Sequence, residues 1–350
     1  MPILLQRRSR RRAEEGVEAA APMATEPVLK PLLGLVQELE PFHQLLQCLD
    51  RGESSLCRGV LGSARPPVLA ALAEQLKLPL LWVTPGQDAA ERLHEDLALY
   101  GTESFLFPER DRSLGVDPLR MELLERLQRQ EARVVVAPIR ALLQKTLAAS
   151  DLHRGRLDLR KGETTDLTVL LEVLVSEGYT RVPMVERRGE ISLRGGILDV
   201  YPATDEPVRI ELFGDDIESI RRFDKDTQRS LVQLDRIVLL PAREEGGSYL
   251  TEHFPRGSVV LLEEIAQLRL HSLEISQESE SAWLQEGEGP REEGWRGEWG
   301  DVLGMLTPFR TVTLTGWEDL SQGPRVEFPF QPQSVVPGRV DGLFEKLPAL

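Results

Sequence analysis

The sequence predicts an α/β fold, a parallel-sheet domain that carries an inserted α+β domain, on two observations. Short apolar runs alternate with helical patterns over residues 27–150 and resume after residue 241, which is typical of parallel strands buried on both faces. Between them, residues 151–241 show one helical segment followed by strands in which apolar residues alternate with polar ones. That alternation is typical of an antiparallel sheet with one wet face. The length of 350 residues suits two such domains.

The first α/β segment shows its elements in alternating order. The run LPLLWVTP at 78–85 predicts a buried strand, and residues 86–101 predict a helix from apolar residues at helical spacing before a glycine. A second helix is predicted over 121–130. Residues 132–144 predict a strand, a proline-containing turn and a helix. This order favours a parallel sheet.

The pattern changes near residue 151. Residues 166–179 predict a helix, and the strands of the inserted domain follow it up to residue 241. The α/β style then returns with a buried strand at 258–264 and a further strand at 310–320. We therefore expect residues 242–335 to complete the domain that residues 27–150 begin.

Three segments fall outside this framework. Residues 1–26 include RRSRRR but no apolar segment of a signal peptide, so we expect a disordered tail, with Met23 as an alternative start. Residues 283–300 are acidic and rich in glycine, and we expect a mobile surface segment that its tryptophans, Trp283, Trp295 and Trp299, can dock. Residues 336–350 resemble the start of a linker or helix that leads into something larger.

Composition limits the partners. The formal net charge of −15 argues against a broad phosphate-binding surface, so we expect no strong direct binding to DNA. Cys48 and Cys57 have no further cysteine or histidine pair at metal-ligand spacing, which predicts neither a zinc site nor a disulfide framework. We expect no metal, a reduced cytoplasmic setting, no membrane contact and a monomer.

The stretch GVLGSARPPV at 59–68 lies where a phosphate-binding loop would lie. Laid on the pattern GxxGxGK[ST], Gly59 and Gly62 match, whereas Ala64, Arg65 and Pro66 replace the last glycine, the lysine and the hydroxyl residue. Pro66 also lacks the N–H that such a loop would offer to a phosphate. The sequence therefore favours a plain strand–turn–helix connection and predicts no nucleotide cofactor.

An acidic pair ends the buried strand at 258–264. Glu263 and Glu264 occupy the place at which a nucleotide-binding domain carries the acidic pair that holds magnesium. Pairs of surface glutamates are common, so without the lysine and the hydroxyl residue this pair is weak evidence for a nucleotide site. No nucleophile turn and no other catalytic constellation is present in the sequence, and we predict no enzyme activity for this chain.

Residues 178–202 (GYTRVPMVERRGEISLRGGILDVYP) and 207–231 (PVRIELFGDDIESIRRFDKDTQRSL) resemble the second domain that the excision-repair helicase UvrB shares with the bacterial transcription-repair coupling factors. The flanking segments resemble the first domain, and the similarity covers roughly residues 30–340. The altered loop, and the absence of a long aromatic-bearing hairpin after residue 144, favour the coupling-factor module over UvrB. The resemblance implies a degenerate P-loop helicase-like domain with the UvrA-binding domain inserted.

The resemblance also implies a partner and a site. In the family the second domain binds UvrA, the damage-recognition ATPase, and the matching positions here are Arg181, Arg194, Gly195 and Tyr201. Arginine and tyrosine are enriched at interface hot spots. The alternative is that the two arginines pair within the sheet with Glu186, Glu190 or Asp199, and that the glycines form a bulge. Ser192 departs from UvrB, which tends to carry a basic residue there.

The function that the resemblance implies is a non-catalytic module that recruits UvrA and links stalled RNA polymerase to nucleotide excision repair. In the complete family protein, carboxy-terminal domains cover the same surface until the motor engages. The alternative is a nucleotide-dependent DNA-binding repair enzyme like UvrB, which the residues Ala64, Arg65 and Pro66 argue against.

Overall fold

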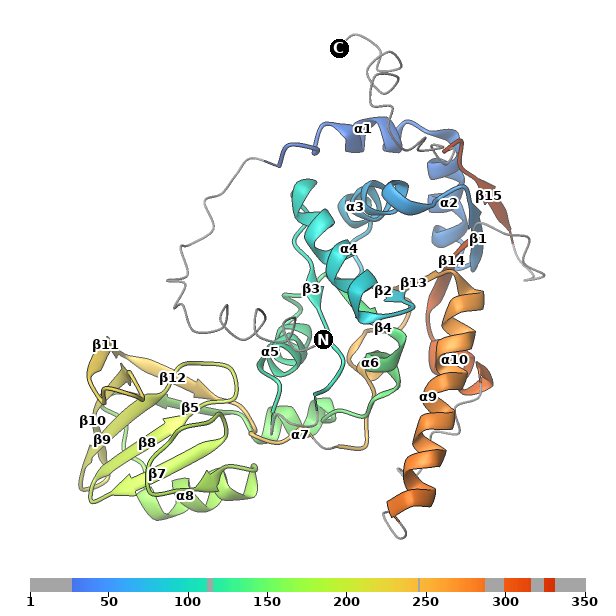
Figure 1. Ribbon diagram of the computed structural model, residues 1–350. Coiled ribbons are helices and arrows are strands. Elements are labelled where there is room, and N and C mark those ends of the chain that lie inside the picture. Colours follow the sequence, from blue (N-terminus) through green and yellow to red (C-terminus); the bar gives the residue numbers. More distant parts are fainter. Residues whose placement is uncertain (1–26, 112–115, 245, 287–298, 316–323, 331–350) are drawn as a thin grey trace, which may run out of the picture.

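The computed structural model describes residues 27–111, 116–244, 246–286, 299–315 and 324–330. These residues form a larger unit and a smaller, β-rich unit beside it (Figure 1). The predicted tail at 1–26 and the predicted linker at 336–350 lie outside the described residues.

A parallel sheet forms the centre of the larger unit. Its strand order is β15-β1-β14-β13-β2-β4-β3, and all neighbouring strands are parallel. The strand bounds are β1 Ser55–Arg58, β2 Leu80–Thr84, β3 Phe105–Leu106, β4 Val134–Pro138, β13 Val259–Glu263, β14 Arg310–Thr315 and β15 Arg325–Glu327. Strands β1 to β4 precede the smaller unit in the chain and β13 to β15 follow it, so two separate chain segments build one sheet.

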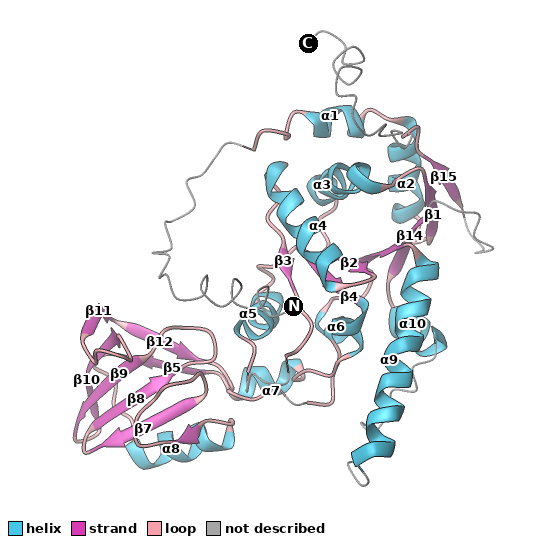
Figure 2. Ribbon diagram, in the orientation of Figure 1, coloured by secondary structure: helices cyan, strands magenta, loops and turns pink. Residues whose placement is uncertain are grey.

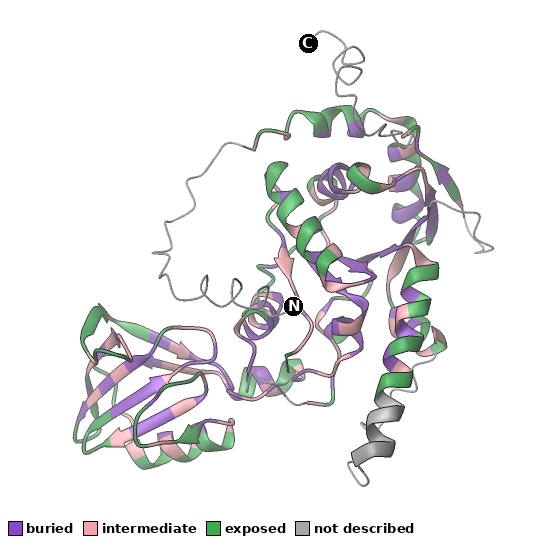
Figure 3. Ribbon diagram, in the orientation of Figure 1, coloured by how far each residue is buried: buried purple, intermediate pink, exposed green. Residues whose placement is uncertain are grey.

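Helices cover both faces of this sheet (Figure 2). Alternate strand residues belong to two cores: Trp82 and Leu261 pack on the side of α1 to α4, whereas Val83 and Leu262 pack on the side of α5, α6, α9 and α10. The helix bounds are α1 Leu32–Gln37, α2 Glu40–Asp50, α3 Arg65–Gln75, α4 Gln87–Leu99, α5 Pro118–Gln128, α6 Ile139–Leu143, α7 Ala149–Arg154, α9 Ile265–Glu286 and α10 Trp299–Leu306. Burial on both faces explains why these strands are continuous apolar runs in the sequence (Figure 3).

The smaller unit contains a second sheet, in the order β11-β10-β9-β8-β7-β6, and a two-stranded ribbon of β12 and β5. All its strand pairs are antiparallel except β6 with β7. Helix α8 (Leu167–Ser176) packs Leu170 and Leu174 against one face of the sheet. The bounds are β5 Leu157–Arg160, β6 Thr180–Arg181, β7 Glu190–Arg194, β8 Ile197–Tyr201, β9 Val208–Phe213, β10 Asp216–Phe223, β11 Ser230–Leu234 and β12 Arg236–Leu239.

The structure confirms the coarse prediction of an α/β fold with a separate β-rich sheet and departs from the sequence analysis in detail. The segment predicted over 283–300 is helical at its two ends, because α9 extends to Glu286 and α10 begins at Trp299. Trp299 packs against the core of the larger unit, as its ring area allows. Trp295 and residues 287–298 lie outside the described residues.

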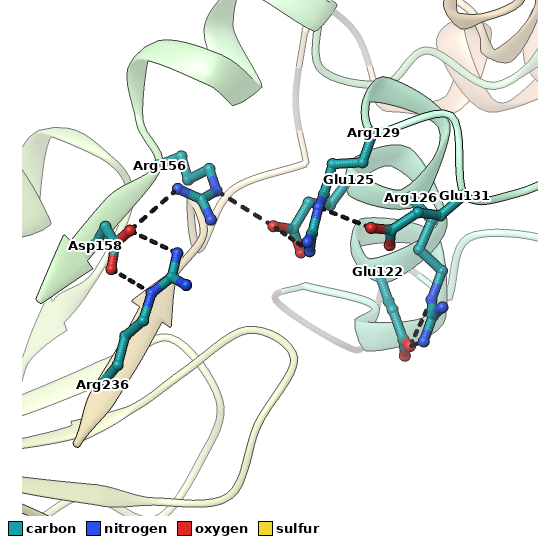
Figure 4. A network of polar contacts seen from close by, with 8 residues as sticks. All are labelled: Glu122, Glu125, Arg126, Arg129, Glu131, Arg156, Asp158 and Arg236. Atoms are coloured by element: carbon teal, nitrogen blue, oxygen red, sulfur yellow. Dashed lines mark hydrogen bonds and ion pairs between the residues drawn. The ribbon is translucent and has the colours of Figure 1, made fainter. Parts of the chain in front are cut away.

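An ion pair joins the two units where the ribbon meets α5, and further pairs within the ribbon continue from it (Figure 4). Arg236 donates to both carboxylate oxygens of Asp158 at 2.6 Å, and Arg156 Nε lies 3.2 Å from Glu125 Oε1 on α5. Arg156 also reaches Asp158 at 3.9 Å. Arg236 holds the pKa of Asp158 below its ordinary value. These groups are partly exposed, and such pairs contribute little to stability, so we expect the network to add little to the stability of either unit.

Candidate functional site

The loop at 59–66 has the strand–turn–helix form that the sequence predicts. Strand β1 leads through a short 3₁₀ turn, Gly62–Ala64, into α3, with Pro66 in the first turn of that helix. Gly59 has a φ of +82°, and a Cβ there would lie 2.4 Å from the carbonyl oxygen of Phe328. The close approach of the Phe328 backbone therefore explains Gly59 without any phosphate.

Arg65 and the acidic pair contact each other. Arg65 Nη1 lies 2.6 Å from Glu263 Oε1, and Arg65 Nη2 lies 3.0 Å from Glu264 Oε1. The second oxygen of Glu263 accepts a hydrogen bond of 3.0 Å from the indole N–H of the buried Trp82. The sequence identified both halves of this cluster as remnants of a nucleotide site, but it gave no indication that they bind each other.

Burial sets the electrostatics of this cluster. It raises the pKa of Glu263 above its ordinary value, while the charge of Arg65 and the hydrogen bond from Trp82 oppose that rise. The side chains of Arg65, Glu263 and Glu264 are 20%, 9% and 13% exposed. Both terminal nitrogens of the guanidinium are thus engaged by carboxylates of the same chain, at the position where a nucleotide-binding loop carries its phosphate-binding lysine.

The predicted partner-binding residues lie on the smaller unit. Arg194 Nη2 bonds Asp199 Oδ2 at 2.8 Å, which is one of the ion pairs within the sheet that the sequence analysis left open. The Arg194 side chain is nevertheless 54% exposed. Arg181 is exposed on edge strand β6 and makes no ion pair with any residue that the structure describes. Arg194 is therefore both fixed by the sheet and accessible.

The structure does not gather the four predicted residues at one point. Arg194 and Gly195 lie at the turn between β7 and β8, whereas Tyr201 ends β8 opposite Glu190. Arg181 lies opposite Ile191, near that second end. Tyr201 is half-buried, with the guanidinium of Arg188 5.2 Å from its ring.

Two glycines shape the turn between β7 and β8. Gly195 has a φ of +62° with open space where a Cβ would point, so the backbone conformation explains it. A Cβ at Gly196 would lie 2.6 Å from the carbonyl oxygen of Leu212 on β9. The absence of a side chain at Gly196 therefore allows the backbone of the turn to lie close to the backbone of β9.

Asp199 is a residue that the sequence analysis considered only as a pairing partner. Its side chain is 2% exposed and accepts from Arg194 and from both Arg209 Nε, at 2.6 Å, and Arg209 Nη2, at 2.9 Å. Arg209 lies over the ring of Phe223, with 4.6 Å to its centroid, and also bonds Gln228. A buried carboxylate between two guanidinium groups thus orients Arg194.

Ser192, where the sequence departs from UvrB, is buried. Its hydroxyl donates to the carbonyl oxygen of Pro183 at 2.8 Å, so the loop at 182–189 covers this position. A basic side chain would not fit under that loop in this arrangement.

The described residues offer no further class of site. No group of three or more histidine, cysteine, aspartate or glutamate side chains is arranged to hold a metal ion in that part of the chain. Nor does any described helix combine the length and the apolar character that crossing a bilayer requires.

Comparison with known proteins identifies first the class of the inserted unit and then its relatives. Residues 157–244 match the UvrB interaction domain, so the smaller unit carries a domain of this class. The transcription-repair-coupling factor of Bacillus subtilis is 33% identical over 221 residues, which cover 60% of this chain and 19% of the relative. The factor of Myxococcus xanthus is 36% identical over 222 residues, 58% of this chain and 18% of the relative. That of Escherichia coli is 31% identical over 203 residues, 55% of this chain and 18% of the relative.

These matches confirm the resemblance drawn from the sequence: the chain is homologous to the amino-terminal UvrB-like module of the transcription-repair-coupling factors. It spans about a fifth of the length of those relatives.

Proposed function

We propose that this chain is a docking module that recruits UvrA to sites of stalled transcription in nucleotide excision repair. The observation that carries the proposal is the UvrB interaction domain at 157–244, whose sheet presents an exposed arginine oriented by a buried carboxylate. An arginine held in this way loses little conformational freedom when a partner's carboxylate binds, because its orientation is set beforehand.

We further propose that the larger unit is a degenerate P-loop helicase-like domain without nucleotide hydrolysis. Arg65 occupies the position of the lysine but is neutralised by Glu263 and Glu264, and Pro66 offers no N–H to a phosphate. An incoming triphosphate would have to displace two carboxylates from the guanidinium and would then lie beside both negative charges. This arrangement argues against the alternative of a UvrB-like nucleotide-dependent enzyme.

The remaining partners follow from the same proposal. We expect a cytoplasmic monomer that uses no cofactor and binds DNA only weakly, since its net charge is −15. In the complete coupling factor, the carboxy-terminal domains would compete with UvrA for the docking surface.

Calorimetric titration of UvrA with the full chain tests the docking proposal. We expect the wild type to bind and the variant Arg181→Ala with Arg194→Ala to lose several kcal/mol of binding free energy, on the order of a hot-spot loss. Arg51→Ala, which removes an exposed arginine of the larger unit, is the matched control and should bind like the wild type. A folded wild type that does not associate with UvrA would refute the proposal.

Titration with ATP and magnesium tests the non-catalytic part. We expect no saturable binding at micromolar ATP and no phosphate release. Micromolar affinity that Arg65→Ala abolishes would instead favour the UvrB-like enzyme.

A further inference from the structure

Two exposed apolar side chains flank Arg194 on the smaller unit. Ile197 lies directly opposite Arg194 in the β7–β8 pair and opposite Glu211 in the β8–β9 pair. The N–H of Leu212 donates to the carbonyl oxygen of Gly196 at 2.8 Å, so the next residue, Phe213, comes level with the same turn. We call Arg194, Ile197 and Phe213 the hairpin patch.

The exposure of Phe213 has no explanation within the described residues. Its exposed fraction of 76% is the highest among the large hydrophobic residues that the structure describes, and Ile197 is 36% exposed. Val208, Ile210 and Leu212 of the same strand face the core, so strand alternation directs Phe213 to the opposite face. No described aromatic or cationic group stacks on its ring. An aromatic ring in this setting is a typical anchor for a partner.

The charge around the patch points to the chemistry of that partner. Asp199 carries one negative charge between Arg194 and Arg209, so this trio leaves one net positive charge at Arg194. The exposed Asp215 and Asp216 add negative charge on the other side of Phe213, which pairs with Asp216 in the β9–β10 ladder. The adjacent Arg221 and Glu211 form a neutral pair. A partner's carboxylate complements the Arg194 side of the patch, where the guanidinium is exposed, and a partner's apolar side chain complements the ring of Phe213.

The rest of this face is less open. The loop at 182–189 covers Ser192 through the Pro183 carbonyl, and Arg188 of the same loop lies against the ring of Tyr201. That loop exposes Met184 (45%) near the charged residues Glu186 and Arg187, whereas the turn end of β7 and β8 exposes the ring of Phe213 and the guanidinium of Arg194.

We propose that the hairpin patch is the contact centre of the UvrA-docking surface, with Phe213 as the apolar anchor and Arg194 as the partner of an acidic side chain of UvrA. This inference rests on the proposed function. It narrows the docking surface from the four residues that the sequence suggested to the turn end of β7 and β8. Arg181 and Tyr201 then lie at the periphery of the contact.

Calorimetric titration of UvrA with Phe213→Ser tests the inference. Leu231→Ser is the matched control, because Leu231 is an apolar residue of the same sheet, is 57% exposed and lies on the far edge strand β11. We expect Phe213→Ser to raise the Kd by about tenfold or more and Leu231→Ser to change it by less than about twofold. Phe213→Tyr, which keeps the ring, should bind like the wild type.

The outcomes separate the two proposals. If the wild type binds UvrA and Phe213→Ser binds equally well, or if Leu231→Ser weakens binding as much, the hairpin patch is not the contact centre, while the docking function stands. If the wild type does not bind, the docking function fails and this inference fails with it. Circular dichroism of each variant shows that it is folded, and the exposure of Phe213 makes loss of folding a poor explanation for weak binding.

Discussion

Replacing Arg65 with alanine would test whether this side chain stabilises the cluster that it forms with Glu263 and Glu264. The substitution removes the ion pairs with Glu263 and Glu264, at 2.6 Å and 3.0 Å, and leaves two adjacent carboxylates without their cation. Glu263 keeps only its hydrogen bond from Trp82. We therefore expect the larger unit to be destabilised.

The magnitude follows from the burial of the three groups. Removing one partner of a fully buried pair costs about 3–5 kcal/mol, whereas exposed pairs contribute about 0–1 kcal/mol. Arg65 is 20% exposed and Glu263 is 9% exposed, so the cluster lies nearer the buried limit but is partly screened by solvent. We expect Arg65→Ala to lower the free energy of unfolding by about 2–4 kcal/mol.

The destabilisation should depend on pH with a defined sign. Burial raises the pKa of Glu263 above its ordinary value of 4.5, and Arg65 opposes that rise, so the variant's Glu263 has a still higher folded-state pKa. A carboxyl group with a raised folded-state pKa favours folding below its unfolded pKa and loses that contribution as the pH rises through the folded value. The loss of unfolding free energy caused by Arg65→Ala should therefore be small near pH 4.5 and grow toward neutral pH.

Urea unfolding followed by tryptophan fluorescence is a suitable assay, because Trp82 and Trp299 pack in the cores of the larger unit and residues 157–244 contain no tryptophan. Arg65→Ala combined with Glu263→Gln is the control, and it should recover part of the loss because no ionised Glu263 remains. A loss below about 1 kcal/mol, or one that does not change between about pH 5 and about pH 8, would refute this account of Arg65.

Three further predictions concern the scaffold. Glu244→Gln should lower the free energy of unfolding by about 3–5 kcal/mol in urea denaturation, because it leaves the fully buried Arg120 guanidinium without its carboxylate. A loss below about 1 kcal/mol would contradict the buried Arg120–Glu244 ion pair. Burial lowers the pKa of His253, so its contribution to stability is present above its unfolded pKa and is lost as the pH falls. His253→Gln should therefore lose less thermal stability than the wild type between about pH 7.5 and about pH 5.5, and equal pH profiles for the two proteins would argue against this. Gly196→Ala should destabilise the smaller unit, as measured by calorimetry, more than Gly195→Ala, because only the Cβ at Gly196 would collide with the Leu212 carbonyl at 2.6 Å; the reverse order would contradict the close approach of the turn to β9.

The sequence predicted the elements of the larger unit well where both faces of a strand are buried. The run at 78–85 contains β2, and the run at 258–264 contains β13, because a strand buried on both faces leaves a continuous apolar pattern. It missed α9, whose apolar and polar residues follow no clear helical face. It also missed β15, whose three residues Arg325–Glu327 are too few to show alternation.

The candidate site was only partly predictable. The sequence shows that Ala64, Arg65 and Pro66 replace the glycine, the lysine and the hydroxyl residue of a phosphate-binding loop. The position of Arg194 follows from the family resemblance. Phe213 carried a usable signal, since it breaks the inward alternation of Val208, Ile210 and Leu212. That signal shows that the side chain faces water, but it does not show that Arg194 and Ile197 lie beside it.

By itself, then, the sequence determined the local features of this protein: an α/β pattern, an inserted β-rich segment, and a loop without the lysine and hydroxyl that a phosphate would need. The tertiary structure decided the pairings. Arg65 meets Glu263 from 198 positions away, and Arg120 meets Glu244 from 124 positions away. Hydrophobic periodicity records which face of one element is buried, whereas a contact between distant charges depends on the strand order that brings their elements together.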